Sequence, residues 1–172
     1  MARIRSAKTC RTPNSQAWAR YSRRKPKKNY IKALPHTSLL VFKMGKEDPN
    51  YDVKLALVPE QEVQLRSNAL EAARQVANKY LEANILNSYF FRVLVFPHNV
   101  IREHKMAAGA GADRVSRGMS EAFGTPVSVA ARIKKGQPIF LLEGSNSNKK
   151  HLLEAFRRAS RKLSGTYKIR AA

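Results

Sequence analysis

VKLALVPEQEVQLRSNALEAARQVANKYL, residues 53–81, is the stretch that decides the fold. At its start Val53, Leu55 and Leu57 alternate with polar or small residues, and this period of two predicts a strand over Val53–Val58 with one buried face. Further on, apolar residues recur at steps of three and four, the spacing of an amphipathic helix. They are Ala69, Leu70, Ala73, Val76, Ala77, Tyr80 and Leu81. Because proline suits a first helical position, we predict that this helix opens at Pro59, with two acidic residues near its positive end.

The rest of the chain adds four strand patterns and one further helix. The strands are predicted over Thr37–Lys43, Tyr89–Phe96, Val127–Ile133 and Pro138–Leu142. The helix is predicted from near Ser147 to Gly165, since glycine suits the left-handed residue beyond a helix end. This mixed order predicts an α+β fold: a two-layer α/β sandwich with a mainly antiparallel sheet and two helices on one face. We expect a basic N-terminal arm at residues 1–36 and a single domain at residues 37–172.

The formal net charge of +21 is concentrated at the two ends of the chain. Residues 1–32 hold eleven Lys or Arg and no acid, residues 33–101 balance to zero, and residues 149–172 hold eight basic residues and one acid. Clustered cations repel one another until a polyanion neutralises them, whereas a merely solubilising surface would mix both signs. The distribution therefore predicts a nucleic-acid partner.

The N-terminal arm is the first predicted RNA-binding segment. It has too few apolar residues for a core of its own, so we expect it to fold onto a partner. Aromatic rings between its cations suit stacking on bases, although Trp18 and Tyr30 could equally attach the arm to the domain. The candidate contacts are Arg3, Arg5, Lys8, Arg11, Trp18, Arg20, Tyr21, Arg23, Arg24, Lys25, Lys27 and Lys28.

The second predicted RNA-binding segment is the polar face of the late helix. Its candidates are Lys149, Lys150, Arg157, Arg158, Arg161 and Lys162. Lysines in a first turn interact unfavourably with the helix dipole. A phosphate bound at that end would offset this, because it pairs with the ammonium groups and accepts hydrogen bonds from the free backbone N–H groups. The alternative is a pair of lysines screened by solvent.

A thirty-residue connection, PHNVIREHKMAAGAGADRVSRGMSEAFGTP at residues 97–126, forms a predicted protruding glycine-rich loop. Connections this long usually serve a function, although a mobile surface loop is the alternative. Small residues allow close backbone approach to RNA, and cations flank them. A short helical turn is also expected around Ser116–Phe123. The candidate contacts are Arg102, His104, Lys105, Met106, Gly109, Gly111, Asp113, Arg114 and Arg117.

Three segments together resemble the archaeal and eukaryotic form of universal large-subunit ribosomal protein sixteen, formerly the ten-e protein. They are GAGADRVSRGMSEAFGTP in the loop, RKPKKNYIKALPH in the arm and HLLEAFRRASRKL in the late helix. The resemblance implies a two-layer α/β sandwich that binds large-subunit rRNA beside neighbouring ribosomal proteins, in the cytoplasm. It also implies that the loop at residues 102–117 lies near tRNA and the peptidyl-transferase centre. The chain lacks the long C-terminal tail of the eukaryotic form, which favours an archaeal source.

Other classes of function find little support in the sequence. An RNA-processing enzyme could use His98 and His104 as acid and base, but no metal-ligand motif accompanies them. The segment at residues 109–113 lacks the third glycine of a dinucleotide fingerprint. Cys10 is the only cysteine, which excludes an internal disulfide. No apolar stretch is long enough to span a bilayer, and no helix–turn–helix pattern favours duplex DNA. We therefore expect no cofactor, no metal, no membrane contact and no small-molecule substrate.

Overall fold

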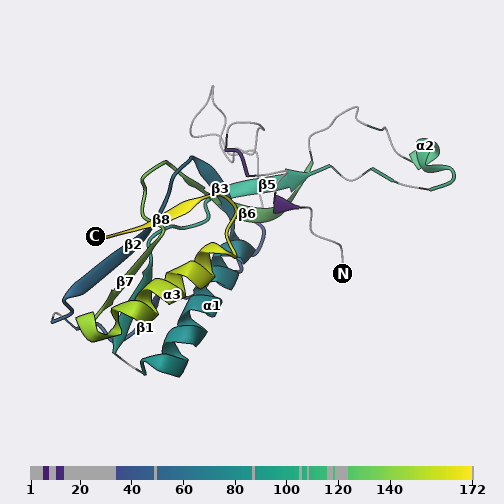
Figure 1. Cartoon of the computed structure of the whole chain (residues 1–172). Helices are drawn as coiled ribbons and strands as arrows, with labels where there is room; N and C mark the ends of the chain where they lie inside the picture. Colours follow the sequence, from purple (N-terminus) through teal and green to yellow (C-terminus); the bar gives the residue numbers. More distant parts are fainter. Residues whose placement is uncertain are drawn as a thin grey trace.

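The computed structural model describes residues 6–7, 11–13, 34–48, 50–86, 88–104, 106–107, 109–115, 118 and 124–171. Two antiparallel sheets form the framework (Figure 1). The five-stranded sheet has the order β1 (Lys43–Gly45), β4 (Tyr89–Val93), β7 (Phe140–Gly144), β2 (Val53–Pro59) and β8 (Tyr167–Ala171). The three-stranded sheet has the order β3 (Val63–Arg66), β6 (Thr125–Ile133) and β5 (Asn99–Glu103).

Two long helices, α1 (Ser67–Asn84) and α3 (Lys149–Ser160), lie side by side on one face of the five-stranded sheet (Figure 1). A 3-10 turn, Asn146–Asn148, leads into α3, and the single-turn helix α2 (Ala112–Val115) lies far from this body. These features confirm the predicted α+β fold with its two helices on one face. The sheet is divided into two, which the sequence patterns did not predict.

The core lies between the helices and the five-stranded sheet. The apolar stripe of α1 supplies Leu70, Ala73, Ala77 and Leu81, and that of α3 supplies Leu152, Ala155, Phe156 and Ala159, all fully buried. The ring of Phe91 in β4 packs against Phe140 of β7 and Phe156 of α3, with centroids 5.4 and 6.4 Å away. Both helices are therefore fixed to the sheet by their apolar stripes, and their polar faces point outward.

The predicted start of the first helix was wrong. Pro59 ends β2, and the strand β3 intervenes before α1 begins at Ser67. Val63 and Leu65 are buried and alternate along β3, which pairs with β6 from Val63 opposite Ile133. A strand-forming period of two thus extends beyond Pro59, which ends β2 instead of opening the helix.

Several other boundaries also differ from the predictions. The strand expected at Thr37–Lys43 is β1, which begins only at Lys43. The helix expected to reach Gly165 ends at Ser160, and Gly165 takes a positive φ of 109° in the turn that follows. Strands β5 and β8 were not predicted, and β5 occupies the start of the expected loop. The helical turn in the loop is α2, N-terminal to the expected Ser116–Phe123, most of which lies outside the described residues.

Candidate nucleic-acid interface

The polar face of α3 carries the densest group of predicted contacts in the described structure. Lys149 and Lys150 lie in the first turn, Arg157 and Arg158 in the last, and Arg161 and Lys162 follow directly after it. All six side chains are exposed. The structure therefore brings these six predicted cations together along one helix, on the side opposite the stripe that enters the core.

A single carboxylate, Glu154, balances part of this charge. Its oxygens lie 3.0 Å from Nε of Arg158 and 3.5 Å from a terminal nitrogen of Arg157. The hydrogen bond from Arg158 lowers the pKa of Glu154 below its ordinary value, so the carboxylate is ionised at neutral pH. Arg158 also stacks over the ring of Tyr80 from α1, 4.1 Å from its centroid. These contacts orient both guanidinium groups on the surface.

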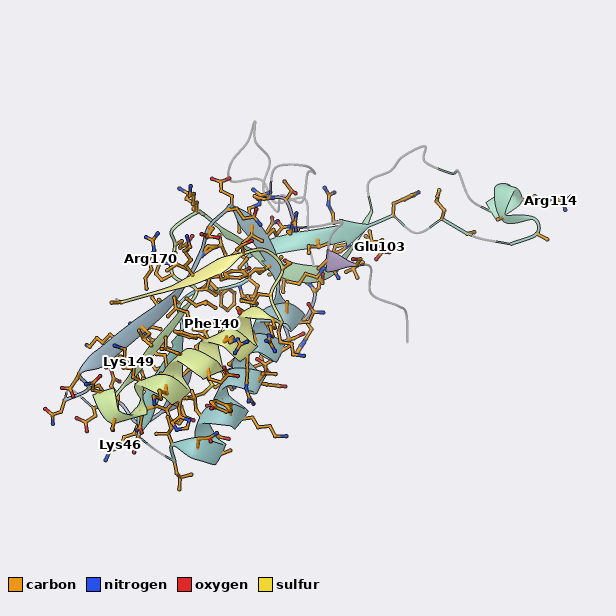
Figure 2. The ribbon with its side chains drawn as sticks, viewed as in Figure 1. Lys46, Glu103, Arg114, Phe140, Lys149 and Arg170 are labelled. Carbon is orange, nitrogen blue, oxygen red and sulfur yellow. The ribbon has the colours of Figure 1, made fainter. Side chains whose placement is uncertain are left out.

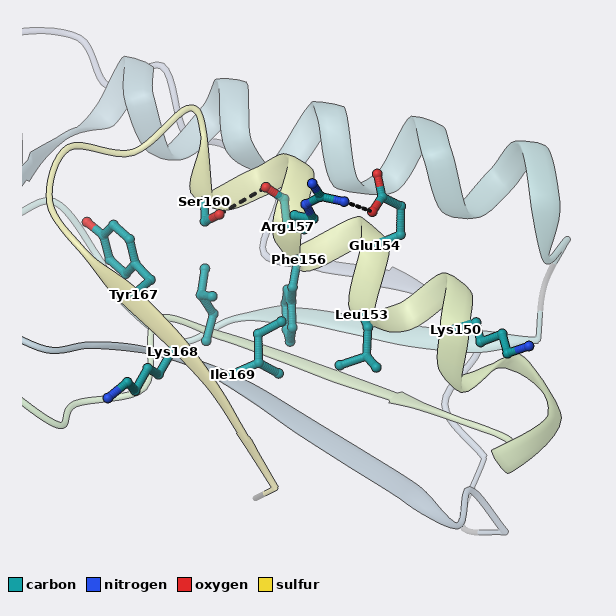
Figure 3. Close-up of a pocket in the computed structure, with 10 residues that line it drawn as sticks. Lys150, Leu153, Glu154, Phe156, Arg157, Ser160, Tyr167, Lys168 and Ile169 are labelled. Carbon is teal, nitrogen blue, oxygen red and sulfur yellow. Dashed lines mark hydrogen bonds and ion pairs between the residues drawn. The ribbon is translucent and has the colours of Figure 1, made fainter.

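Strand β8 adds two cations that the sequence analysis did not select, Lys168 and Arg170, both exposed. Tyr167 and Ile169 alternate with them and face α3, so a period of two could have identified the strand. A groove of about 610 Å³ runs between α3 and β8, lined by apolar Leu153 and Ile169 and flanked by Lys150 and Arg157 (Figure 3). Figure 3 shows the Lys168 ammonium pointing away from α3.

The N-terminal arm is attached to the body at β3. The backbone N–H of Gln64 donates to the carbonyl oxygen of Arg11 over 2.7 Å, and the guanidinium of Arg66 donates to that of Ser6 over 2.8 Å. Of the predicted arm contacts only Arg11 lies among the described residues, and the rest lie outside them: Arg3, Arg5, Lys8, Trp18, Arg20, Tyr21, Arg23, Arg24, Lys25, Lys27 and Lys28.

The predicted loop is carried on a two-stranded ribbon. Strands β5 and β6 pair from Asn99 opposite Ala130 to Glu103 opposite Thr125, and the ribbon projects from the body toward α2 (Figure 1). Figure 2 shows Glu103 where the ribbon ends and Arg114 beyond it, at the far end of the extension. A methyl group on Gly124 would overlap the backbone of Glu103 and His104, so glycine lets the two chain segments approach closely here.

The predicted loop contacts occupy two different environments. Arg102 belongs to β5 and is half-buried, and burial lowers the pKa of its guanidinium. His104, beside it, contacts the carbonyl oxygen of Gly118 through Nε2 at 2.8 Å. At the tip, Met106, Gly109, Gly111 and Arg114 are exposed. Lys105, Arg117 and the side chain of Asp113 lie outside the described structure.

The histidines of the enzymatic alternative each have a structural contact. His98 packs against the ring of Phe96 with centroids 4.7 Å apart, and His104 contacts Gly118. Within the described part of the chain, no three His, Cys, Asp or Glu side chains gather into a group that could hold a metal ion. The same residues include no helix with the length and apolar character needed to cross a bilayer.

Comparison with known proteins gives one consistent family. Residues 18–170 match the family described as ribosomal protein L16p/L10e. The chain is 43% identical to the large ribosomal subunit protein uL16 of Archaeoglobus fulgidus over 156 residues, 90% of each chain. It is 48% identical to that of Thermofilum pendens over 135 residues, 78% of this chain and 80% of the relative. Identity to the protein of Methanococcus aeolicus is 40% over 167 residues, 96% of this chain and 92% of the relative.

Proposed function

We propose that this chain, which belongs to the ribosomal protein L16p/L10e family and is a structural constituent of the large ribosomal subunit rather than an enzyme, binds rRNA through its basic arm and α3. The observation that carries the proposal is the row of six exposed cations, four on α3 and two directly after it, opposed by the single carboxylate Glu154. Lys and Arg contacts to phosphate oxygens supply affinity and fix the orientation of a protein on its nucleic acid.

The scaffold gives this charge a rigid mount. Residues 33–101, which supply β1–β4, α1 and the start of β5, carry equal numbers of basic and acidic residues, so they add no net attraction for RNA. The apolar stripe of α3 is fully buried, which holds the helix at a fixed angle to the sheet. Cations on a preordered helix lose less conformational entropy on binding than the same cations on a free chain.

The arm and the ribbon provide further surfaces for RNA beside α3. The arm is attached to β3 through Ser6 and Arg11, and we assign rRNA to the further cations of residues 1–32. The ribbon of β5 and β6 carries a tip with exposed small residues and Arg114. Small residues let the protein backbone approach closely, so this tip is suited to contact a second RNA. We assign tRNA near the peptidyl-transferase centre to this tip, and the family resemblance supports that assignment.

A salt titration of binding tests the rRNA proposal. The full chain should bind large-subunit rRNA with a logarithm of affinity that falls linearly with the logarithm of salt concentration. Replacing Lys149, Lys150, Arg161 and Lys162 by Gln should make this slope shallower by about four, near one for each phosphate that is no longer neutralised. Replacing Lys46 and Lys79, exposed cations of the neutral region, should leave the slope unchanged. A wild-type affinity insensitive to salt would contradict the proposal.

A further inference from the structure

The face of the five-stranded sheet opposite the helices carries cations that neither the arm nor α3 includes. The strand registers align one residue from each strand in a single row across the sheet. Lys43 pairs with Arg92, Arg92 with Leu141, Leu141 with Ala56, and Ala56 with Arg170. Their neighbours along the strands, such as Phe91 and Leu142, belong to the core beneath the helices. Because side chains alternate between faces, the row lies on the opposite side of the sheet.

The residues in the middle of this outer face are buried, whereas those along its β8 edge are exposed to solvent. Ala56, Val58 and Leu141 form a small apolar cluster, each at most 9% exposed. Along the edge, Lys168 pairs with Val58 and Arg170 with Ala56, and both cations are exposed. The turn between β6 and β7 adds exposed Lys135 to the same place.

These three cations surround a pocket of about 550 Å³, lined by Val58, Pro59, Glu60, Lys135, Gly136, Lys168 and Arg170. Glu60 is its only acid, and its carboxylate lies 2.6 Å from the ammonium of Lys168. Among the described residues, no carboxylate lies within ion-pair distance of Lys135 or Arg170, so both charges are available to an external anion. Figure 2 shows Arg170 on β8, separated from Lys149 of α3.

We propose that this pocket is a further RNA-backbone site, which binds a phosphate through Lys135 and Arg170, with Lys168 at its edge. The inference rests on the proposed rRNA-binding function. It extends that function to a surface other than the arm and α3. Charge complementarity selects the occupant, because a protein interface of comparable strength needs an apolar or aromatic anchor at its centre. Val58 and Pro59, the apolar residues of the lining, are buried in the sheet and offer no such anchor.

The position of the pocket gives it a distinct role. Lys168 lines both this pocket and the groove beside α3, so β8 is the edge at which two basic surfaces meet. Cations on α3 lie on the helix side of the sheet, and Arg170 lies on the other. An RNA segment on each side would hold the sheet edge between them, so that the domain is bound from both faces of the sheet rather than from the helix side alone.

The test uses the full chain, in vitro transcribed large-subunit rRNA and the salt titration described above. We expect K135Q/R170Q to make the slope shallower by about two and to weaken binding at low salt, since each phosphate contact contributes close to one. The matched control K46Q/K79Q removes the same charge from the neutral region and should leave the slope unchanged. The charge-conserving variant K135R/R170K should keep the slope of the wild type.

The outcomes separate this inference from the function on which it rests. If K135Q/R170Q binds as the wild type while the α3 variant is weakened, the pocket site is refuted and the rRNA proposal stands. A charge-conserving variant with a salt slope as shallow as that of K135Q/R170Q would also refute it, because the number of phosphates neutralised depends on the charges, which this variant keeps. If the wild-type affinity for rRNA does not depend on salt and no variant changes that affinity, the rRNA proposal itself fails.

Discussion

Glu154 is a negatively charged residue on the surface that we assign to rRNA, so it weakens the proposed interaction. Its carboxylate contacts Arg157 and Arg158 on the face that we assign to rRNA. The hydrogen bond from Arg158 lowers the pKa of Glu154, so this negative charge persists at any pH near neutrality and is lost only on acidification below the ordinary range. A phosphate must therefore compete with Glu154 for both guanidinium groups, which limits affinity while keeping the arginines oriented.

Removing this carboxylate should strengthen RNA binding. E154Q keeps the size of the side chain and frees both arginines, so we expect affinity for large-subunit rRNA to rise by up to about fivefold, the scale of exposed ion pairs. E47Q makes the same change in net charge at an exposed residue outside α3 and should have a smaller effect. Equal gains from the two variants would show that only net charge matters, and weaker binding by E154Q would contradict the assignment of this face.

At the scale of elements, the ribbon of β5 and β6 holds the loop tip away from the packed core of the domain. The core is built from α1, α3 and the sheets, and none of its residues comes from the described part of the tip at 106–115. The close approach at Gly124 and the contact between His104 and Gly118 join the two sides of the ribbon before the tip begins. The tip can therefore change length without disturbing packing.

Shortening this tip tests its assignment to tRNA. We expect deletion of Ala107–Ala112 to leave the melting temperature within about 2 °C of the wild type, because the packing of the core stays intact. Ribosomes that carry this variant should bind tRNA less tightly. A control of unchanged length, with Ala107, Ala110 and Ala112 replaced by Ser, should retain tRNA binding. Loss of folding on deletion would show that the tip belongs to the core, and normal tRNA binding would refute the assignment.

The elements also show which sequence patterns predict structure and which do not. Long periodic segments were predicted well: the stripes of α1 and α3 enter the core, and β6 covers the expected alternation. The short strands β3, β5 and β8 were missed for different reasons. Strand β3 follows a proline that was predicted to start a helix, and β5 lies inside the predicted loop. Strand β8 has a clear alternation, which the sequence analysis did not use. Of the site, the sequence predicted the cations of α3, but the outer-face group of Lys135, Lys168 and Arg170 depends on pairing between distant strands.

At the scale of the whole molecule, a neutral framework separates several basic surfaces. The described part of the arm contacts β3, α3 covers one face of the five-stranded sheet, and the ribbon projects from the body (Figure 1). The pocket at β8 lies on the opposite face of that sheet. No one of these surfaces accounts for the net charge of +21. A protein of this form is suited to a position between several RNA segments, because α3, the pocket at β8 and the ribbon face different directions.

Crosslinking of rRNA to protein in intact ribosomes tests this account most directly. Ribosomes that contain the full chain would be irradiated, digested and analysed for peptides that carry nucleotides. We predict crosslinked peptides from residues 1–36, from α3 and from β8, all attached to large-subunit rRNA, and few from the exposed face of α1 around Lys79. Crosslinks as frequent on α1 as on α3, or a protein that sediments apart from ribosomes, would contradict it.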